Sequence, residues 1–340
     1  MRPCFAVKSA LAGTAAGLML ATASPAFAQT ETPAGAGVII RHDARFDALV
    51  PAGATIEKVA QGFVFLEGPV WRKSDSRLFY SDLRGNAIYQ WTAAEGVRDV
   101  SKPFFTGDGT GLRGVGPNGI ALDAEGRLLA CVYGSRSVIR LEKDGKRTTL
   151  AERFEGKRLN SPNDLVVARD GTVYFTDPSF GLEGTDNSPL RELAFNGVYR
   201  IRSNGQLDLL TRELERPNGL VLSPDEKILY VANSGGGAVT GWLAYDLGAA
   251  GLANKRVLFD VTGVEGEGGA DGMKVDLDGN VYATGPGGVW VIAPDGTHLG
   301  TIRPAEALTN VGWGDDGRTL YITGRTALYR IRLSARGAIQ

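Results

Sequence analysis

The chain has 340 residues, 43% of them hydrophobic, and its 37 basic and 38 acidic residues give a net charge of −1 at pH 7. Because no basic stripe or cluster appears, the sequence argues against a nucleic-acid partner. Only two histidines are present, His42 and His298, so a His-rich metal site and a Ser-His-Asp triad are also disfavoured.

The first 28 residues have the pattern of a secretory signal peptide. Arg2 and Lys8 give a charged start, residues 11–21 are apolar, and Ala26-Phe27-Ala28 fits the small-x-small cleavage pattern. We expect cleavage before Gln29 and export to the periplasm or the medium, with an uncleaved membrane anchor as the alternative. No later stretch is apolar over the length that a bilayer requires, so no membrane span is expected after cleavage.

The remaining chain divides into a short segment and one long domain. Residues 29–52 are rich in Ala, Gly and Thr, which predicts an N-terminal tail or linker. Residues 53–340 show short apolar or alternating runs separated by Gly, Asp, Asn and Pro, without a long amphipathic helix. This pattern predicts a single all-β domain.

A polar residue recurs at the start of apolar, β-branched runs, and we call these six positions the anchors. They are separated by 51, 45, 55, 53 and 39 residues. Most are followed by a turn and then by further strand-like runs. Several strands per repeat at a period of roughly 40–50 residues indicate propeller blades, so we predict a six-bladed β-propeller. The anchors are Glu67, Asn118, Asn163, Asn218, Asp271 and Asn310.

Asn-Gly and Asp-Gly pairs are also common in hairpins. That explains the turns six or seven residues after an anchor, such as Asp170-Gly171 and Asp278-Gly279. It explains the anchors poorly, because these follow blade-connecting loops and are not flanked by two strands. We therefore predict that the anchors start the inner strands, and that residues 54–59 add a strand to the last blade and close the ring.

The anchor side chains should converge, because the inner strands of a propeller surround a central channel. All six are oxygen donors, which suit Ca²⁺, Mg²⁺ or Mn²⁺ and disfavour copper. Glu67 and Asp271 balance a divalent charge, and the amides of Asn163 and Asn218 can complete part of the shell. The alternative for each Asn is a local bond to turn backbone.

Several motifs together resemble the gluconolactonase/regucalcin/luciferin-regenerating-enzyme family, also described as senescence-marker-protein-like. They cover roughly residues 60–332 and imply a six-bladed propeller with one divalent metal in its central channel. Members hydrolyse lactones, and related propellers hydrolyse organophosphates. The motifs are Glu67-Gly-Pro-Val-Trp, Asn160-Ser-Pro-Asn163-Asp164, Asp-Gly-x-Val-Tyr-Phe-Thr-Asp-Pro ending at Pro178, Pro217-Asn218-Gly and Ala270-Asp271-Gly-Met.

Residue roles follow from the resemblance position by position. It implies that Asp271 is both a metal ligand and the catalytic base or nucleophile. Arg158 and Asn160 match a substrate-contacting Arg-x-Asn, and Asn118 occupies an equivalent blade position as a further ligand or substrate contact. One departure is Val132-Tyr133-Gly134, where many bacterial members carry Glu-His-Gly. The implied metal ligands are Glu67, Asn163, Asn218 and Asp271.

The expected function is a metal-dependent hydrolase, a gluconolactonase-like lactonase acting on sugar lactones. Ca²⁺ is favoured, with Zn²⁺, Mg²⁺ and Mn²⁺ as alternatives. The rival functions are a phosphotriester hydrolase on the same site and a non-enzymatic periplasmic ligand-binding propeller. A strictosidine-synthase-like propeller would need no metal, and the acidic and amide anchors argue against it.

Overall fold

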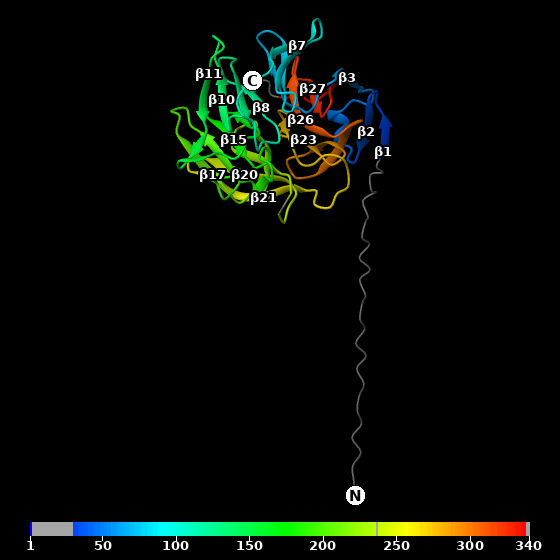
Figure 1. Ribbon diagram of the computed structural model, residues 1–340. Helices are drawn as coiled ribbons and strands as arrows, with labels where there is room; N and C mark the ends of the chain where they lie inside the picture. Colours follow the sequence, from blue (N-terminus) through cyan, green and yellow to red (C-terminus); the bar gives the residue numbers. More distant parts are fainter. Residues whose placement is uncertain (2–29, 236, 338–340) are drawn as a thin grey trace.

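The structure is a computed structural model that describes residues 1, 30–235 and 237–337. Six antiparallel sheets are arranged around a common centre as the blades of a propeller (Figure 1). The predicted six-bladed β-propeller is therefore confirmed. The predicted signal peptide lies outside the described residues, Met1 excepted.

The first three blades follow each other in chain order, from an inner to an outer strand. A two-stranded hairpin, β12 (Arg153–Phe154) and β13 (Lys157–Arg158), lies between the second and the third. The blades are β4 (Leu66–Arg72), β5 (Arg77–Asp82), β6 (Ala87–Thr92) and β7 (Gly96–Ser101); β8 (Pro117–Leu122), β9 (Leu128–Val132), β10 (Ser137–Leu141) and β11 (Arg147–Ala151); and β14 (Leu165–Val167), β15 (Val173–Asp177), β16 (Gly197–Ile201) and β17 (Leu207–Thr211).

The last three blades complete the ring, and two short helices lie in the loops: α1 (Phe46–Leu49) and the 3₁₀ helix η1 (Thr185–Asn187). The blades are β18 (Pro217–Leu222), β19 (Ile228–Asn233), β20 (Gly241–Gly248) and β21 (Gly251–Asp260); β22 (Met273–Val275), β23 (Val281–Gly285), β24 (Gly288–Ile292) and β25 (His298–Pro304); and β26 (Leu308–Gly314), β27 (Thr319–Gly324), β28 (Ala327–Arg332) and β3 (Ile56–Gln61).

The sixth blade joins the two ends of the propeller. Its outer strand β3 comes from the N-terminal part of the chain and pairs with β28, with Ile56 opposite Ile331. The predicted closure of the ring by residues 54–59 is confirmed, with the strand observed at Ile56–Gln61. This pairing ties the start of the domain to its end by backbone hydrogen bonds.

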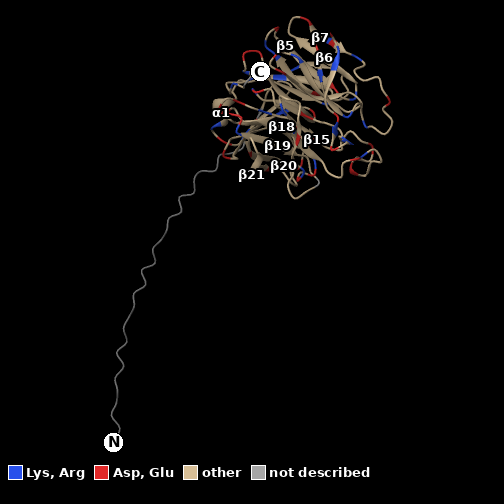
Figure 2. Cartoon of the chain, turned by 90° about the vertical axis from the view of Figure 1, so that its left-hand side faces the viewer, with Lys and Arg blue, Asp and Glu red and all other residues tan. Residues whose placement is uncertain are grey.

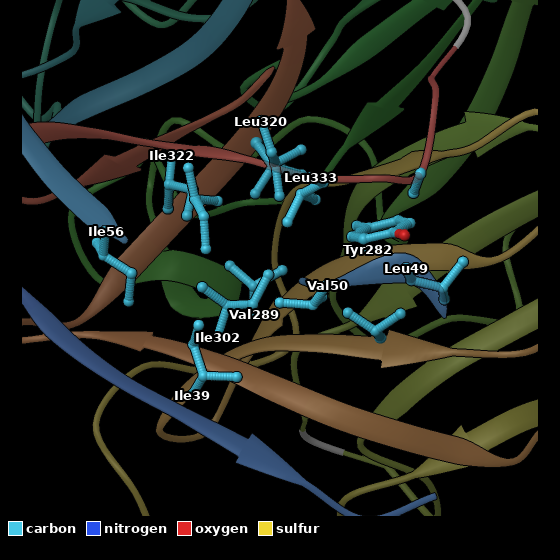
Figure 3. Packing of buried hydrophobic residues seen from close by; sticks show 14 of the residues in the cluster. Ile39, Leu49, Val50, Ile56, Tyr282, Val289, Ile302, Leu320, Ile322 and Leu333 are labelled. Atoms are coloured by element: carbon cyan, nitrogen blue, oxygen red, sulfur yellow. The ribbon is translucent and has the colours of Figure 1, made fainter. Parts of the chain in front are cut away.

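The prediction of a tail or linker over residues 29–52 is wrong for most of that segment. β1 (Thr30–Pro33) and β2 (Gly37–Arg41) extend the fifth blade, because β2 pairs with β25 (Figure 1). Ile39, Leu49 and Val50 are buried against Val289 and Ile302 of that blade and against neighbouring side chains of the sixth (Figure 3). The apolar run at residues 38–40 outweighs the Ala- and Gly-rich composition, since its burial stabilises the added strands.

Six hydrophobic clusters hold the blades together, one between each pair of neighbours. Inner and middle strands such as β8 and β15 are buried along their whole length, because blades cover both of their faces. The outer strand β7 is largely exposed. The channel walls are thus rigid, well-packed elements.

Basic and acidic residues are interspersed along the surface loops (Figure 2). Among the residues that the structure describes, no helix is long and apolar enough to span a bilayer.

Candidate active site in the central channel

The anchors lie at corresponding points of the six inner strands. Glu67, Asn118 and Asn218 are the second residues of β4, β8 and β18, and Asn310 is the third of β26. Asn163 and Asp271 precede β14 and β22 by two residues each. The inner strands contact their neighbours around the ring, so the structure brings all six predicted positions to one end of the channel.

Backbone irregularities mark the anchors in four of these strands. The ladder register shifts between Glu67 and Val70, between Pro117 and Ile120, between Pro217 and Leu220, and at Asn310. Such bulges redirect side chains and often lie beside active sites. They direct the anchor side chains away from the regular alternation of the sheet.

The glycine after an anchor is required by close packing around the channel. A Cβ on Gly119 would collide with the carboxylate of Asp164, and a Cβ on Gly272 would collide with the amide of Asn310. Neither glycine lies in a hairpin. The anchor-Gly pairs therefore mark the contact between adjacent inner strands, which confirms the distinction made from the sequence.

Tyr133 links two of the anchors. Its buried hydroxyl accepts hydrogen bonds from Asn118 Nδ2 at 2.9 Å and from Asn163 Nδ2 at 2.8 Å. Because both amide nitrogens face Tyr133, both amide oxygens are turned elsewhere. Tyr133 occupies the position where the resemblance led us to note a missing histidine, and sequence analysis did not identify it as a site residue.

Asn310 links two carboxylates across the channel. Its Nδ2 donates to Glu67 Oε2 at 3.2 Å and to Asp164 Oδ2 at 3.3 Å. Asp164 stands where most other blades have the glycine that follows the anchor, and it is buried. It is a second site residue that sequence analysis missed, although the Asn163-Asp164 pair was visible as a motif.

The last part of the ring is formed by Asn218 and Asp271. Asn218 Nδ2 donates to Ser234 Oγ at 2.9 Å, and the Asn218 side chain beside the Asp271 carboxylate counteracts part of the rise in its pKa. Ser234 Oγ in turn donates to the Ala270 carbonyl at 2.5 Å. The backbone next to Asp271 is thereby fixed by the neighbouring blade.

The pKa values of three acidic groups at the anchor level are raised, mainly because the protein keeps water from their carboxylates. Burial raises the pKa of Glu67 to about 8, and the carboxylate of Asp164 adds to that shift. Burial likewise raises the pKa of Asp271, and the carboxylates of Glu67 and Asp164 raise it further. Burial raises the pKa of Asp164 and lowers the pKa of Lys274. The Lys274 ammonium opposes part of these shifts, because its positive charge and the negative charges of Asp164 and Glu67 stabilise each other. These carboxylates can lose their protons more easily when a cation binds beside them.

The donor set fits a hard divalent metal. Within the described residues, the buried oxygens Asn118 Oδ1 and Asn218 Oδ1 have no hydrogen-bond partner, and an unpaired buried polar atom is costly unless a ligand satisfies it. No group of three or more His, Cys, Asp or Glu side chains in the described part of the chain has metal-binding geometry. A metal here would therefore rely on amide oxygens as well as carboxylates.

Two of the three predicted substrate contacts, Arg158 and Asn160, lie on the loop before the third blade. Arg158 ends β13, is partly exposed, and donates from Nη2 to the Ser135 carbonyl at 2.7 Å. Asn160 is fully buried, and its Nδ2 donates to the carbonyl oxygens of Phe195 at 2.9 Å and Asp177 at 3.2 Å. These bonds give Asn160 a part in holding the loop, and its substrate contact stays a prediction.

An all-β propeller with a ring of acidic and amide side chains at one end of its channel belongs to the class of six-bladed propellers with a polar central site. A model of the SMP-30/Gluconolactonase/LRE-like region matches residues 65–326. The chain belongs to this family.

Individual relatives cover most of the chain. A gluconolactonase of Zymomonas mobilis is 37% identical over 88% of this chain and 87% of its own length. A solved gluconolactonase from Xanthomonas campestris is 32% identical, with a TM-score of 0.77 over 91% of this chain and 98% of that one. A pentonolactonase of Haloferax volcanii is 27% identical over 76% of this chain and 80% of its own.

Proposed function

We propose that this protein is a divalent-metal-dependent lactonase that opens sugar lactones at the anchor end of the channel. Membership of the family and the names of its relatives, two gluconolactonases and a pentonolactonase, support this substrate class. One observation carries the assignment of the reacting group. Five anchors are at most 6% exposed, whereas Asp271 is partly exposed. Asp271 is therefore the anchor most open to a substrate.

The proposed metal ligands are Glu67, Asn163, Asn218 and Asp271. We favour Ca²⁺, because the set consists of hard oxygen donors and because calcium accepts neutral amide oxygens beside carboxylates; Zn²⁺, Mg²⁺ and Mn²⁺ are the alternatives. When bound, such an ion supplies Lewis-acid polarisation of a carbonyl oxygen.

Asp271 acts as base or nucleophile in this proposal. As a base, its carboxylate takes a proton from the water whose oxygen bonds to the lactone carbonyl carbon. The ring C–O bond then breaks, and the proton passes to the leaving ring oxygen to give the open hydroxy acid. Asn118 and Asn160 are proposed to contact substrate oxygens, and Arg158 to orient them through its donor fork.

A lactone panel on chelated protein tests this function. We expect exhaustive chelation to abolish hydrolysis of sugar lactones, and add-back of single metal ions to restore it, with Ca²⁺ effective. Unchanged hydrolysis after chelation would contradict the metal. Turnover of organophosphates alone would indicate a phosphotriester hydrolase, and tight metal binding without turnover of any substrate would indicate a ligand-binding propeller.

We also propose that the protein is exported, on the basis of its N-terminal sequence pattern. Cell fractionation followed by mass spectrometry of the N-terminus should find the chain in the periplasm or the medium, beginning at Gln29. A cytoplasmic chain that retains residues 1–28 would contradict this proposal.

A further inference from the structure

A second ring of side chains lies beyond the anchors, three residues further along each inner strand. All six of its members line a cavity of about 600 Å³ on the side of the channel away from the anchors. Five of the six carry no charge, and Lys274 is the exception. The ring consists of Val70, Ala121, Val166, Val221, Lys274 and Trp313.

Lys274 lies between this cavity and the acidic end of the channel. Its Nζ donates to the Met273 carbonyl at 3.1 Å, and its electrostatic partners are the carboxylates of Asp164 and Glu67. An ammonium among apolar side chains costs several kcal/mol unless opposite charges compensate it. Among the residues that the structure describes, the carboxylates of Asp164 and Glu67 at the anchor level supply this compensation.

Four charged side chains form a cluster at this end of the channel, and their formal charges can be added. Glu67, Asp164 and Asp271 contribute three negative charges when ionised, and Lys274 contributes one positive charge. Asp177 is another buried carboxylate, but it accepts hydrogen bonds from the backbone N–H groups of Asn160 and Ser161 on the loop side. With all four groups in their charged forms, as expected beside a bound cation, the channel cluster carries a net charge of −2, which one divalent ion balances.

We infer that Lys274 is a positioning residue that sets the charge of the site, so that the cluster holds one divalent cation and discriminates against trivalent ones. This inference rests on the metal-dependent function proposed above. Without the ammonium, the same three carboxylates would present a charge of −3. Because Coulomb energy is proportional to the charge of the bound ion, a trivalent ion would gain more from this change than a divalent one.

The test compares Ca²⁺ and Tb³⁺ binding to the wild-type protein, K274M and K274Q. Calorimetry gives the Ca²⁺ affinity, and Tb³⁺ luminescence with Ca²⁺ competition gives the ratio of the two affinities. We expect Ca²⁺ to bind about tenfold more tightly to K274M than to the wild type. Because the gain in binding free energy is proportional to the ionic charge, Tb³⁺ should gain about thirtyfold, so the preference for Tb³⁺ over Ca²⁺ should rise about threefold. K274Q keeps a polar side chain and should behave like K274M.

V70M is the matched control, because it places a methionine in the same ring without changing the charge, and it should bind both ions like the wild type. If wild-type protein binds Ca²⁺ and both lysine variants keep its affinity and its ion preference, the role of Lys274 is wrong while the metal-dependent function stands. If wild-type protein binds no divalent ion, both are wrong. Circular dichroism checks that each variant is folded.

Discussion

The two levels of the central channel are built from the same six strands and have opposite chemistry. At the anchor level every side chain carries an oxygen donor, and two of the buried amide oxygens have no partner within the described residues. Three residues further along the strands, five of six side chains are uncharged and face a cavity. The propeller thus makes side chains converge at both levels, and only their chemical type decides which level binds a cation.

The largest expected effect separates the anchor level from the surface of the same blade. D271N keeps the size of the side chain but removes a base and a charge, so we expect kcat/KM for a sugar lactone to fall by about 10²–10⁴. D278N removes an exposed carboxylate from the turn after β22 and should change kcat/KM little. Near-normal turnover by D271N at saturating metal would refute the assignment.

Tyr133 gives the next largest effect. Y133F removes the hydroxyl that accepts bonds from Asn118 and Asn163 but retains the ring. Residues that orient metal ligands typically contribute about 10–100-fold to affinity, and we expect a loss of metal affinity in that range by calorimetry. Y199F removes a buried hydroxyl that has no partner within the described residues and should leave the affinity unchanged. Equal affinities for the two variants would exclude a positioning role.

Tyr133 also shows where sequence reasoning ends. The anchors could be predicted because a repeated fold places equivalent residues at equivalent points, and the blade period fixes that equivalence. Tyr133 lies on no such repeat. It was visible only as a departure from a family motif, and its bonds to two anchors depend on how the loop after β9 folds over the channel.

Composition misled the prediction in a second region. Residues 29–52 were predicted as a tail or linker because of their Ala, Gly and Thr content, yet β1 and β2 extend the fifth blade. A sheet edge accepts any strand that can pair with it and bury a few side chains, and Ile39 and Ile40 provide that burial. Asn160 is a related case, because its family motif does not reveal that its side chain is bonded to the surrounding loop.

The pH dependence of the unfolding free energy should also distinguish the anchor level, which carries the carboxylates, from the second ring. Glu67 has a folded pKa of about 8, above its ordinary value of 4.5, so the folded state holds a proton that the unfolded state has already released. Stability of the chelated protein should therefore fall as the pH rises toward 8. Between pH 6.5 and 8 we expect a loss of about 1–2 kcal/mol. His298 has a pKa lowered to about 4 by burial, so most of its effect on stability falls below pH 6.5, and the small remainder within this window has the opposite sign.

Urea unfolding of chelated and Ca²⁺-loaded protein measures this effect. The bound ion replaces the proton on Glu67, so the loaded protein should show a flatter profile, and E67Q should remove most of the slope from the chelated one. A chelated protein that becomes more stable between pH 6.5 and 8 would show that Glu67 is already ionised without metal.

The smallest expected effect lies at the cavity level. V221A removes two buried methyl groups from the second ring, and the open cavity beside them limits the contacts that are lost. We expect unfolding free energy to fall by about 1 kcal/mol and metal affinity to stay at the wild-type value, because no charge or oxygen donor changes. Urea unfolding and calorimetry on one preparation measure both quantities. A large change in metal affinity would mean that packing at the second ring controls the geometry of the anchors, and the two levels would then have to be treated as one site.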